Sequence, residues 1–287
     1  EDAEIGTSLA FTPEDFEKAG VRLEKEAFAR ITLDSTLYSS GGVNISIIGE
    51  IEFVPTIDMD VSIHGGSLDY LKLTGTGTLT VNLDLQVTAG AGATLQNELS
   101  LFDDILHTSK PSKVLCFFVG PVPVCLSVEL DLLLNASAGI GAQANLSAGF
   151  DSSAAVTVGA EYDSGTWRDL SDVDLDPNVH VPTWSIDAGF QSRLKVKPVL
   201  NTRLYGLTGP TLTIEPYAAF TVTVTPPPLR AELGAGIDAE LGFNLVHLEA
   251  FSLDFDVGYE HTFEGPYYVL WSYTAPAPSG TSFSIND

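Results

Sequence analysis

The stretch that decides the fold runs from Val122 to Ala148 and reads VPVCLSVELDLLLNASAGIGAQANLSA. Every even-numbered residue in it is apolar, and the odd positions between them are mostly Ser, Glu, Asp, Asn, Gln and Gly. An alternation of period two places one row of side chains against a core and the other in water, which is typical of a β-strand. The run is much longer than a usual strand of about 5–6 residues. It therefore predicts long, half-buried strands.

The same alternation recurs along the chain, on odd positions from Leu79 to Leu95 and from Leu229 to Leu245, and on even positions from Leu212 to Val224. Three of the runs contain a short segment of small residues, at 88–93, 137–142 and 233–238. Gly on the outer face lets a strand bend, and Ala on the inner face lets facing layers approach closely. We expect a narrow waist there. The alternative is a groove or tunnel that takes a lipid or an inserted strand.

These patterns predict an all-β fold of long antiparallel strands, packed as an extended sandwich or roll. Residues 1–20 form a separate N-terminal segment with one short helix, because Thr12 suits the N-cap and Pro13 the first helical position. The all-β body spans 21–274, and its alternation stops at 101–113, which is a candidate connection between two halves. Residues 275–287 are rich in Pro, Ser and Gly and are typical of a linker-like tail.

The chain has 38 acidic and 13 basic residues, a formal net charge of −25. This charge repels phosphate backbones and anionic lipid surfaces, so it excludes a nucleic-acid partner. Asp172, Asp174 and Asp176 form the densest acidic cluster and are candidate Ca²⁺ ligands, since hard oxygen ligands suit that ion. A solvated strand face is the alternative that we favour. The sequence contains no uninterrupted apolar stretch long enough for a transmembrane helix.

Two cysteines, Cys116 and Cys125, flank a Gly-Pro turn between apolar arms, which predicts a disulfide. A disulfide that closes so short a loop stabilises the fold by roughly 2–3 kcal/mol, so it is a local support rather than the main support of the fold. Three sequons predict N-glycosylation at Asn44, Asn135 and Asn145, and the last two fall on the wet face of the opening run. Both features suit an extracellular protein.

No catalytic constellation is apparent. The nucleophile elbow, the P-loop and the H-E-x-x-H motif are absent, and no histidine has a metal-ligand spacing. Trp167 and Trp184 bracket the acidic cluster and form a candidate carbohydrate platform, although aromatic residues also cap the ends of β cores. A pair of carboxylates for glycoside hydrolysis stays open, because the separation of such a pair exists only in the fold.

Two stretches resemble a known group. Residues 119–124, VGPVPV, precede a long Ala/Gly/Ser-rich strand, and residues 158–167 contain the pattern G-x-x-Y-x-x-G-x-W. Both are similar to uncharacterised secreted proteins of filamentous fungi, over roughly residues 100–260. The resemblance implies a β-rich extracellular domain without an assigned activity, so no functional residue is carried over.

We therefore expect a non-enzymatic structural or surface glycoprotein that is secreted, lies outside the cell or on its surface, and self-assembles or binds other extracellular proteins. The start at Glu1, without a leader, suits a mature secreted chain. A module that binds lipid or carbohydrate is the alternative, and a carbohydrate-active enzyme is a weaker one. Apart from Ca²⁺, no cofactor is predicted.

Overall fold

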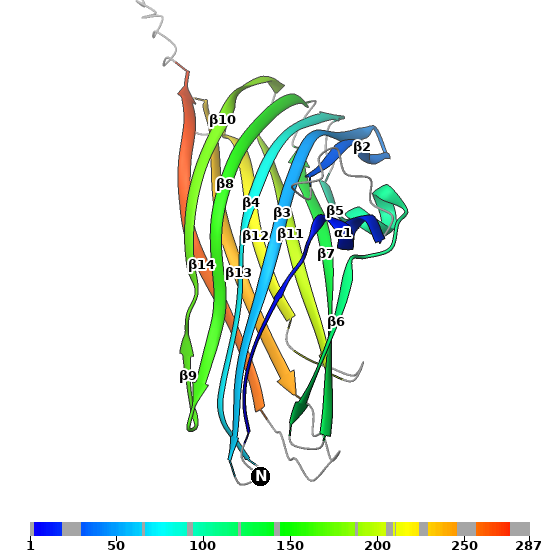
Figure 1. Cartoon of the computed structure of the whole chain (residues 1–287). Coiled ribbons are helices and arrows are strands. Elements are labelled where there is room, and N and C mark those ends of the chain that lie inside the picture. Colours follow the sequence, from blue (N-terminus) through cyan, green and yellow to red (C-terminus); the bar gives the residue numbers. More distant parts are fainter. Residues whose placement is uncertain are drawn as a thin grey trace, which may run out of the picture.

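The computed structural model describes residues 3–18, 30–64, 67–90, 94–119, 122–140, 144–186, 189–204, 209, 211–223, 229–245 and 257–275. Two antiparallel sheets of seven strands each pack face to face along a common long axis (Figure 1). This confirms the predicted all-β fold of long antiparallel strands. Among the described residues, no helix is long and apolar enough to span a membrane.

Sheet A has the strand order β1-β3-β4-β8-β10. In addition, β2 lies end to end with β1 along one edge of β3, and β9 lies end to end with β10 along β8. Its strands are β1 (Ala3–Ala10), β2 (Arg30–Ser40), β3 (Val43–His64), β4 (Ser67–Ala89), β8 (Ala144–Asp163), β9 (Thr166–Asp169) and β10 (Asp172–Ile186).

Sheet B has the order β14-β13-β12-β11-β7-β5, and β6 lies end to end with β5 along β7. Its strands are β5 (Thr94–Ser100), β6 (Ser112–Val119), β7 (Val122–Ile140), β11 (Phe190–Leu204), β12 (Thr211–Thr223), β13 (Arg230–Leu245) and β14 (Val257–Thr274).

The stretch from Val122 to Ala148 holds two strands in different sheets. β7 in sheet B ends at Ile140, and β8 in sheet A begins at Ala144. The even positions remain buried on both sides of the crossing, from Leu126 to Ala138 and from Leu146 to Phe150. One core lies between the two sheets. The even-numbered residues therefore face this core both before and after the chain crosses from one sheet to the other.

A second crossing leads from β4, which ends at Ala89, to β5, which begins at Thr94. The small-residue segments at 88–93 and 137–142 therefore fall at sheet-to-sheet connections, and residues 91–93 and 141–143 lie outside the described residues. The third segment, 233–238, lies inside β13. Two of the three segments thus lie at connections between the sheets, and the third lies within a strand.

The N-terminal segment holds more than a helix. β1 precedes the short helix α1 (Pro13–Lys18), and β1 pairs with β3, so the segment belongs to sheet A. The Thr12 amide and hydroxyl both donate to the Asp15 carboxylate at 2.7 Å, which holds the first turn. Residues 19–29 and the tail 276–287 lie outside the described residues.

Segment 101–113 connects two strands of one sheet, since β5 before it and β6 after it both pair with β7. A π-helical turn, η1 (Leu101–Leu106), fills this connection and buries Leu101 and Phe102 completely. Inward side chains of both sheets form one hydrophobic cluster, which also contains these two residues. The segment therefore does not separate two halves.

Candidate functional site

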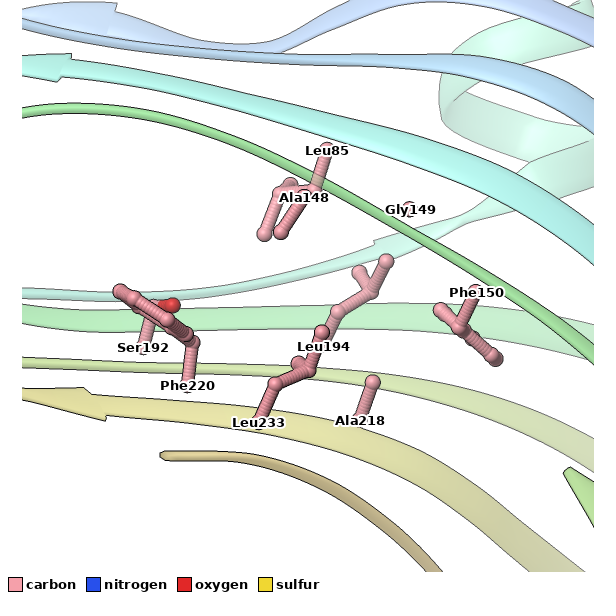
Figure 2. Close-up of a pocket in the computed structure, with 9 residues that line it drawn as sticks. All are labelled: Leu85, Ala148, Gly149, Phe150, Ser192, Leu194, Ala218, Phe220 and Leu233. Carbon is pink, nitrogen blue, oxygen red and sulfur yellow. The ribbon is translucent and has the colours of Figure 1, made fainter. Parts of the chain in front are cut away.

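The space between the sheets is largely filled by protein. Figure 2 shows one cavity, where side chains of β4 and β8 face those of β11, β12 and β13. Its volume is about 20 Å³, and a second cavity lined by residues such as Ile57 and Leu212 measures about 10 Å³. One water molecule needs roughly 10–15 Å³. Neither cavity has room for a lipid chain.

The outer faces differ in charge. The strands of sheet A carry fifteen acidic and three basic residues, and those of sheet B carry nine acidic and six basic ones. Three of the basic residues, Arg193, Lys195 and Lys197, occupy alternate outward positions of β11 in the middle of sheet B.

Both lysines bind Glu215 on the neighbouring strand β12, and the Lys197 Nζ lies 3.0 Å from its carboxylate. Burial raises the pKa of Glu215, but the hydrogen bonds from the two lysines outweigh burial and hold that pKa below its ordinary value. Lys197 also reaches Glu98 on β5 at 3.4 Å. These ion pairs fix the lysine side chains along β11.

Two tyrosines lie beside this row. Tyr217 on β12 and Tyr267 on β14 are both opposite Gly236 of β13. Their ring centroids are 6.2 Å apart, and the ring planes differ by 16°. A Cβ atom at Gly236 would lie 2.7 Å from the Tyr217 hydroxyl, and one at Gly234 would lie 2.2 Å from the Tyr267 hydroxyl. The rings therefore rest on the backbone of β13, which only glycine leaves uncovered.

Charged groups surround the two rings. The Arg193 guanidinium carbon lies 4.6 Å from the Tyr217 ring centroid, a cation–π contact. The Tyr267 hydroxyl donates to Glu232 at 3.3 Å. Burial raises the pKa of Asp238, which lies in the next row of β13. We call Arg193, Tyr217 and Tyr267, with Glu232 and Asp238 beside them, the tyrosine platform.

A second polar cluster lies on the outer face of sheet A. The ring nitrogens of His180 on β10 contact Asp84 on β4 at 3.2 Å and Asp151 on β8 at 3.1 Å. Gly149 makes room, because a Cβ there would lie 2.1 Å from Asp84 and 2.4 Å from His180. The hydrogen bond to Asp84, together with the charge of Asp151, raises the pKa of His180. The His180 ring links three strands.

The predicted calcium ligands Asp172, Asp174 and Asp176 are exposed on the outer face of β10. Alternate residues of one strand lie about 6.6–6.8 Å apart. Among the described residues, no group of three His, Cys, Asp or Glu side chains has a metal-binding arrangement. The Ca²⁺ site thus stays a prediction, and the structure brings no other ligand to the three aspartates within that part of the chain.

The structure does not bring the two predicted platform tryptophans together. Trp167 lies on β9 and packs against Tyr162, with ring centroids 5.2 Å apart. Trp184 lies between the sheets, near Phe220 and Tyr273. Their partners on β8 are Tyr162 and Leu146, sixteen residues apart, and this spacing corresponds to about 50 Å of strand. Both tryptophans are partly buried and pack against the core, so a platform that uses both side chains is not formed.

Cys116 and Cys125 lie directly opposite each other on β6 and β7 and are bonded, with their Cα atoms 4.1 Å apart. Asn44 and Asn145 are exposed on the outer face of sheet A, whereas Asn135 on sheet B is half-buried and donates to Glu98 at 3.2 Å. All three sequons thus lie on outer faces. Their glycosylation stays a prediction.

One structurally important residue carried no sequence signal. Asp131 on β7 lies where β5 ends and β6 begins, and it is 6 % exposed. Its carboxylate accepts from the Ser100 hydroxyl at 2.8 Å and pairs with Lys110 at 2.8 Å. In the sequence it is simply one polar residue of an alternating run.

Comparison of the chain with family models, with curated proteins and with solved structures gives no match. The resemblance to secreted fungal proteins therefore stays a prediction.

Proposed function

We propose that the protein is a non-enzymatic structural component of an extracellular surface or matrix and acts as a stiff rod. The observation that carries the proposal is the length of its strands. β3 and β4 have 22 and 23 residues, and at about 3.3 Å per residue β4 extends for about 75 Å.

Two features support stiffness. β4 is paired with β3 on one side along the whole of β3, and with β8 on the other side from Tyr70 to Ala89. Bending this region would break cross-strand hydrogen bonds of both ladders. In addition, the inward side chains form one continuous core, and a close-packed interior resists compression. A carrier would instead need internal space.

The sheet edges favour one side of the molecule for self-association. β10 contains Pro177 and Pro182, and β14 contains Pro266, and both strands have register shifts. Proline and bulges block the addition of a further strand. The edge strands on the opposite side, β1, β2, β5 and β6, contain no proline, and their one register shift lies in β2, between Thr36 and Tyr38. We therefore assign self-association to this proline-free side.

Light scattering behind size exclusion, together with negative-stain imaging over a range of concentrations, tests the proposal. We expect rod-shaped particles that associate as concentration rises. Thr32→Lys on β2 should weaken association, because an edge lysine opposes strand addition. Thr262→Lys on β14 is the matched control, since both threonines are exposed and both lie opposite a glutamate. A compact monomer at every concentration would contradict the proposal.

A further inference from the structure

The geometry points to the tyrosine platform as a binding site for a neutral polysaccharide. This inference does not rest on the structural role, because it concerns the outer face of sheet B rather than the edges or the length of the molecule. It adds an adhesive surface to a protein whose interior has no room for a ligand at the cavities described.

The shape of the tyrosine platform supports this inference. The Tyr217 and Tyr267 rings lie nearly parallel to each other, and their hydroxyl ends lie over Gly236 and Gly234 of β13, which carry no side chains. Arg193 covers part of the Tyr217 ring by its cation–π contact. The main open aromatic surface is therefore that of Tyr267, which is 46 % exposed. A pyranose ring has an apolar face of C–H groups, which fits against such an aromatic surface.

Polar groups surround the rings. A sugar offers a rim of hydroxyl groups that both donate and accept hydrogen bonds. Glu232 and Asp238 supply acceptors on β13, one before Gly234 and the other after Gly236, and Arg193 supplies several donors beside Tyr217. Among the described residues, Arg193 forms no ion pair, so its guanidinium donors are available to a ligand. An apolar surface with a few polar groups is the common design of ligand sites.

The negative charge of the protein favours neutral polysaccharides over anionic ones. The chain carries a net charge of −25, and three carboxylates, Glu232, Asp238 and Glu264, lie near the rings. A polyanion, including a nucleic acid or a uronate polymer, would be repelled. Proline-rich peptides also bind aromatic side chains, but they dock in grooves between rings. Here the two ring centroids are 6.2 Å apart, which is too close for a proline ring to lie between two nearly parallel rings.

Binding to insoluble cellulose, chitin and β-1,3-glucan, and affinity electrophoresis in soluble neutral glucans, test the inference with the full chain. We expect at least one of these polymers to bind, and Tyr267→Ala to weaken that binding about tenfold, in line with an aromatic contact of about 1.4 kcal/mol. Tyr268→Ala is the matched control, because Tyr268 is the next residue of β14 and is similarly exposed, at 42 %.

A second pair of variants tests whether the glycine beneath the Tyr267 ring is needed for binding. Gly234→Ala introduces a Cβ that must displace the Tyr267 ring, so it should weaken binding as Tyr267→Ala does. Gly242→Ala lies on the same strand with its nearest neighbour 4.0 Å away, and it should bind as the natural chain does. Thermal unfolding of each variant separates loss of binding from loss of fold. Absence of binding to every neutral polymer, equal binding by Tyr267→Ala, or binding only to a uronate polymer or a proline-rich peptide would overturn the inference.

Discussion

On each side of the sandwich an edge of sheet A meets an edge of sheet B (Figure 1). Different kinds of side-chain contact close the two sides. Where β10 meets β14, Trp184 of sheet A packs against Phe220 and Tyr273 of sheet B, with ring centroids 6.5 and 6.1 Å away. We call this the aromatic side. No charged residue takes part in those contacts.

The opposite side, where β1 and β2 meet β5 and β6, is closed by polar groups, and we call it the polar side. The Asn97 side chain of β5 donates to the Leu37 carbonyl of β2 at 3.0 Å. Lys113 of β6 donates to the Ala10 carbonyl and pairs with Asp15 at 2.9 Å. Burial raises the pKa of Asp15, but its bonds to Lys113 and Thr12 outweigh burial and lower it.

The comparison shows two ways to hold two sheets together. Aromatic packing stabilises the folded state more for each residue buried, but it tolerates small shifts between the sheets. Hydrogen bonds between sheets give less net free energy, but they fix which residue faces which. The side that we assign to self-association is the polar side, where such bonds align the edges.

The largest effect is expected on the aromatic side. Trp184→Ala removes ring contacts that join the two sheets and should lower the free energy of unfolding by about 4 kcal/mol, as large-to-small core substitutions do. Trp167→Ala is the comparison variant. Trp167 is also partly buried against the core, but its ring packs on Tyr162 of the same sheet, so we expect a smaller loss, of about 2 kcal/mol. Urea unfolding measures both. Equal losses would mean that Trp184 does not join the sheets.

On the polar side, the largest effect is expected at Asp131. Asp131→Asn removes the charge that faces Lys110, whose pKa is raised chiefly by its hydrogen bond to Asp131. Breaking such a pair should cost about 2–3 kcal/mol, less than for a fully buried pair because Lys110 is 25 % exposed.

The control for Asp131 uses the same lysine. Asp103 also pairs with Lys110, at 3.1 Å, but its side chain is 54 % exposed. Asp103→Asn should therefore change the free energy of unfolding by less than about 0.5 kcal/mol. If the two variants unfold alike, burial of Asp131 is not what stabilises the gap between β5 and β6.

These two sides also show what could be predicted from sequence. The alternation identified the inward residues correctly, since period two depends only on each strand. It did not separate β7 from β8, because the chain changes sheet without changing phase. Gly236 was visible as a small residue, but its partners Tyr217 and Tyr267 follow from strand register. Likewise, His180 meets Asp84, 96 residues away, only once β4, β8 and β10 are paired.

A smaller effect is expected at the disulfide, which joins β6 to β7 next to the polar side. Replacing both Cys116 and Cys125 by Ser should lower the free energy of unfolding by about 2.5 kcal/mol, the loop entropy of a closed segment of this length. The bond lies on the outer face, so its removal leaves no cavity in the core. Thermal unfolding of the natural chain with and without reductant should give the same difference. A larger loss would show that the bond supports more than its own hairpin.

The smallest effect concerns β10, the sheet A strand of the aromatic side, and it depends on pH. The pKa of His180 is raised in the folded state, chiefly by its hydrogen bond to Asp84, so the stabilisation is fully present below the unfolded-state pKa of about 6.5. It is lost as pH rises through the higher folded-state pKa. Because His180 is 46 % exposed, we expect less than about 1 kcal/mol. Unfolding of the natural chain and of His180→Asn, measured from pH 5 to pH 9, should differ at the acidic end and converge at the alkaline end. A difference that grows with pH would mean that neutral His180, rather than the imidazolium, holds β10 to β8 and β4.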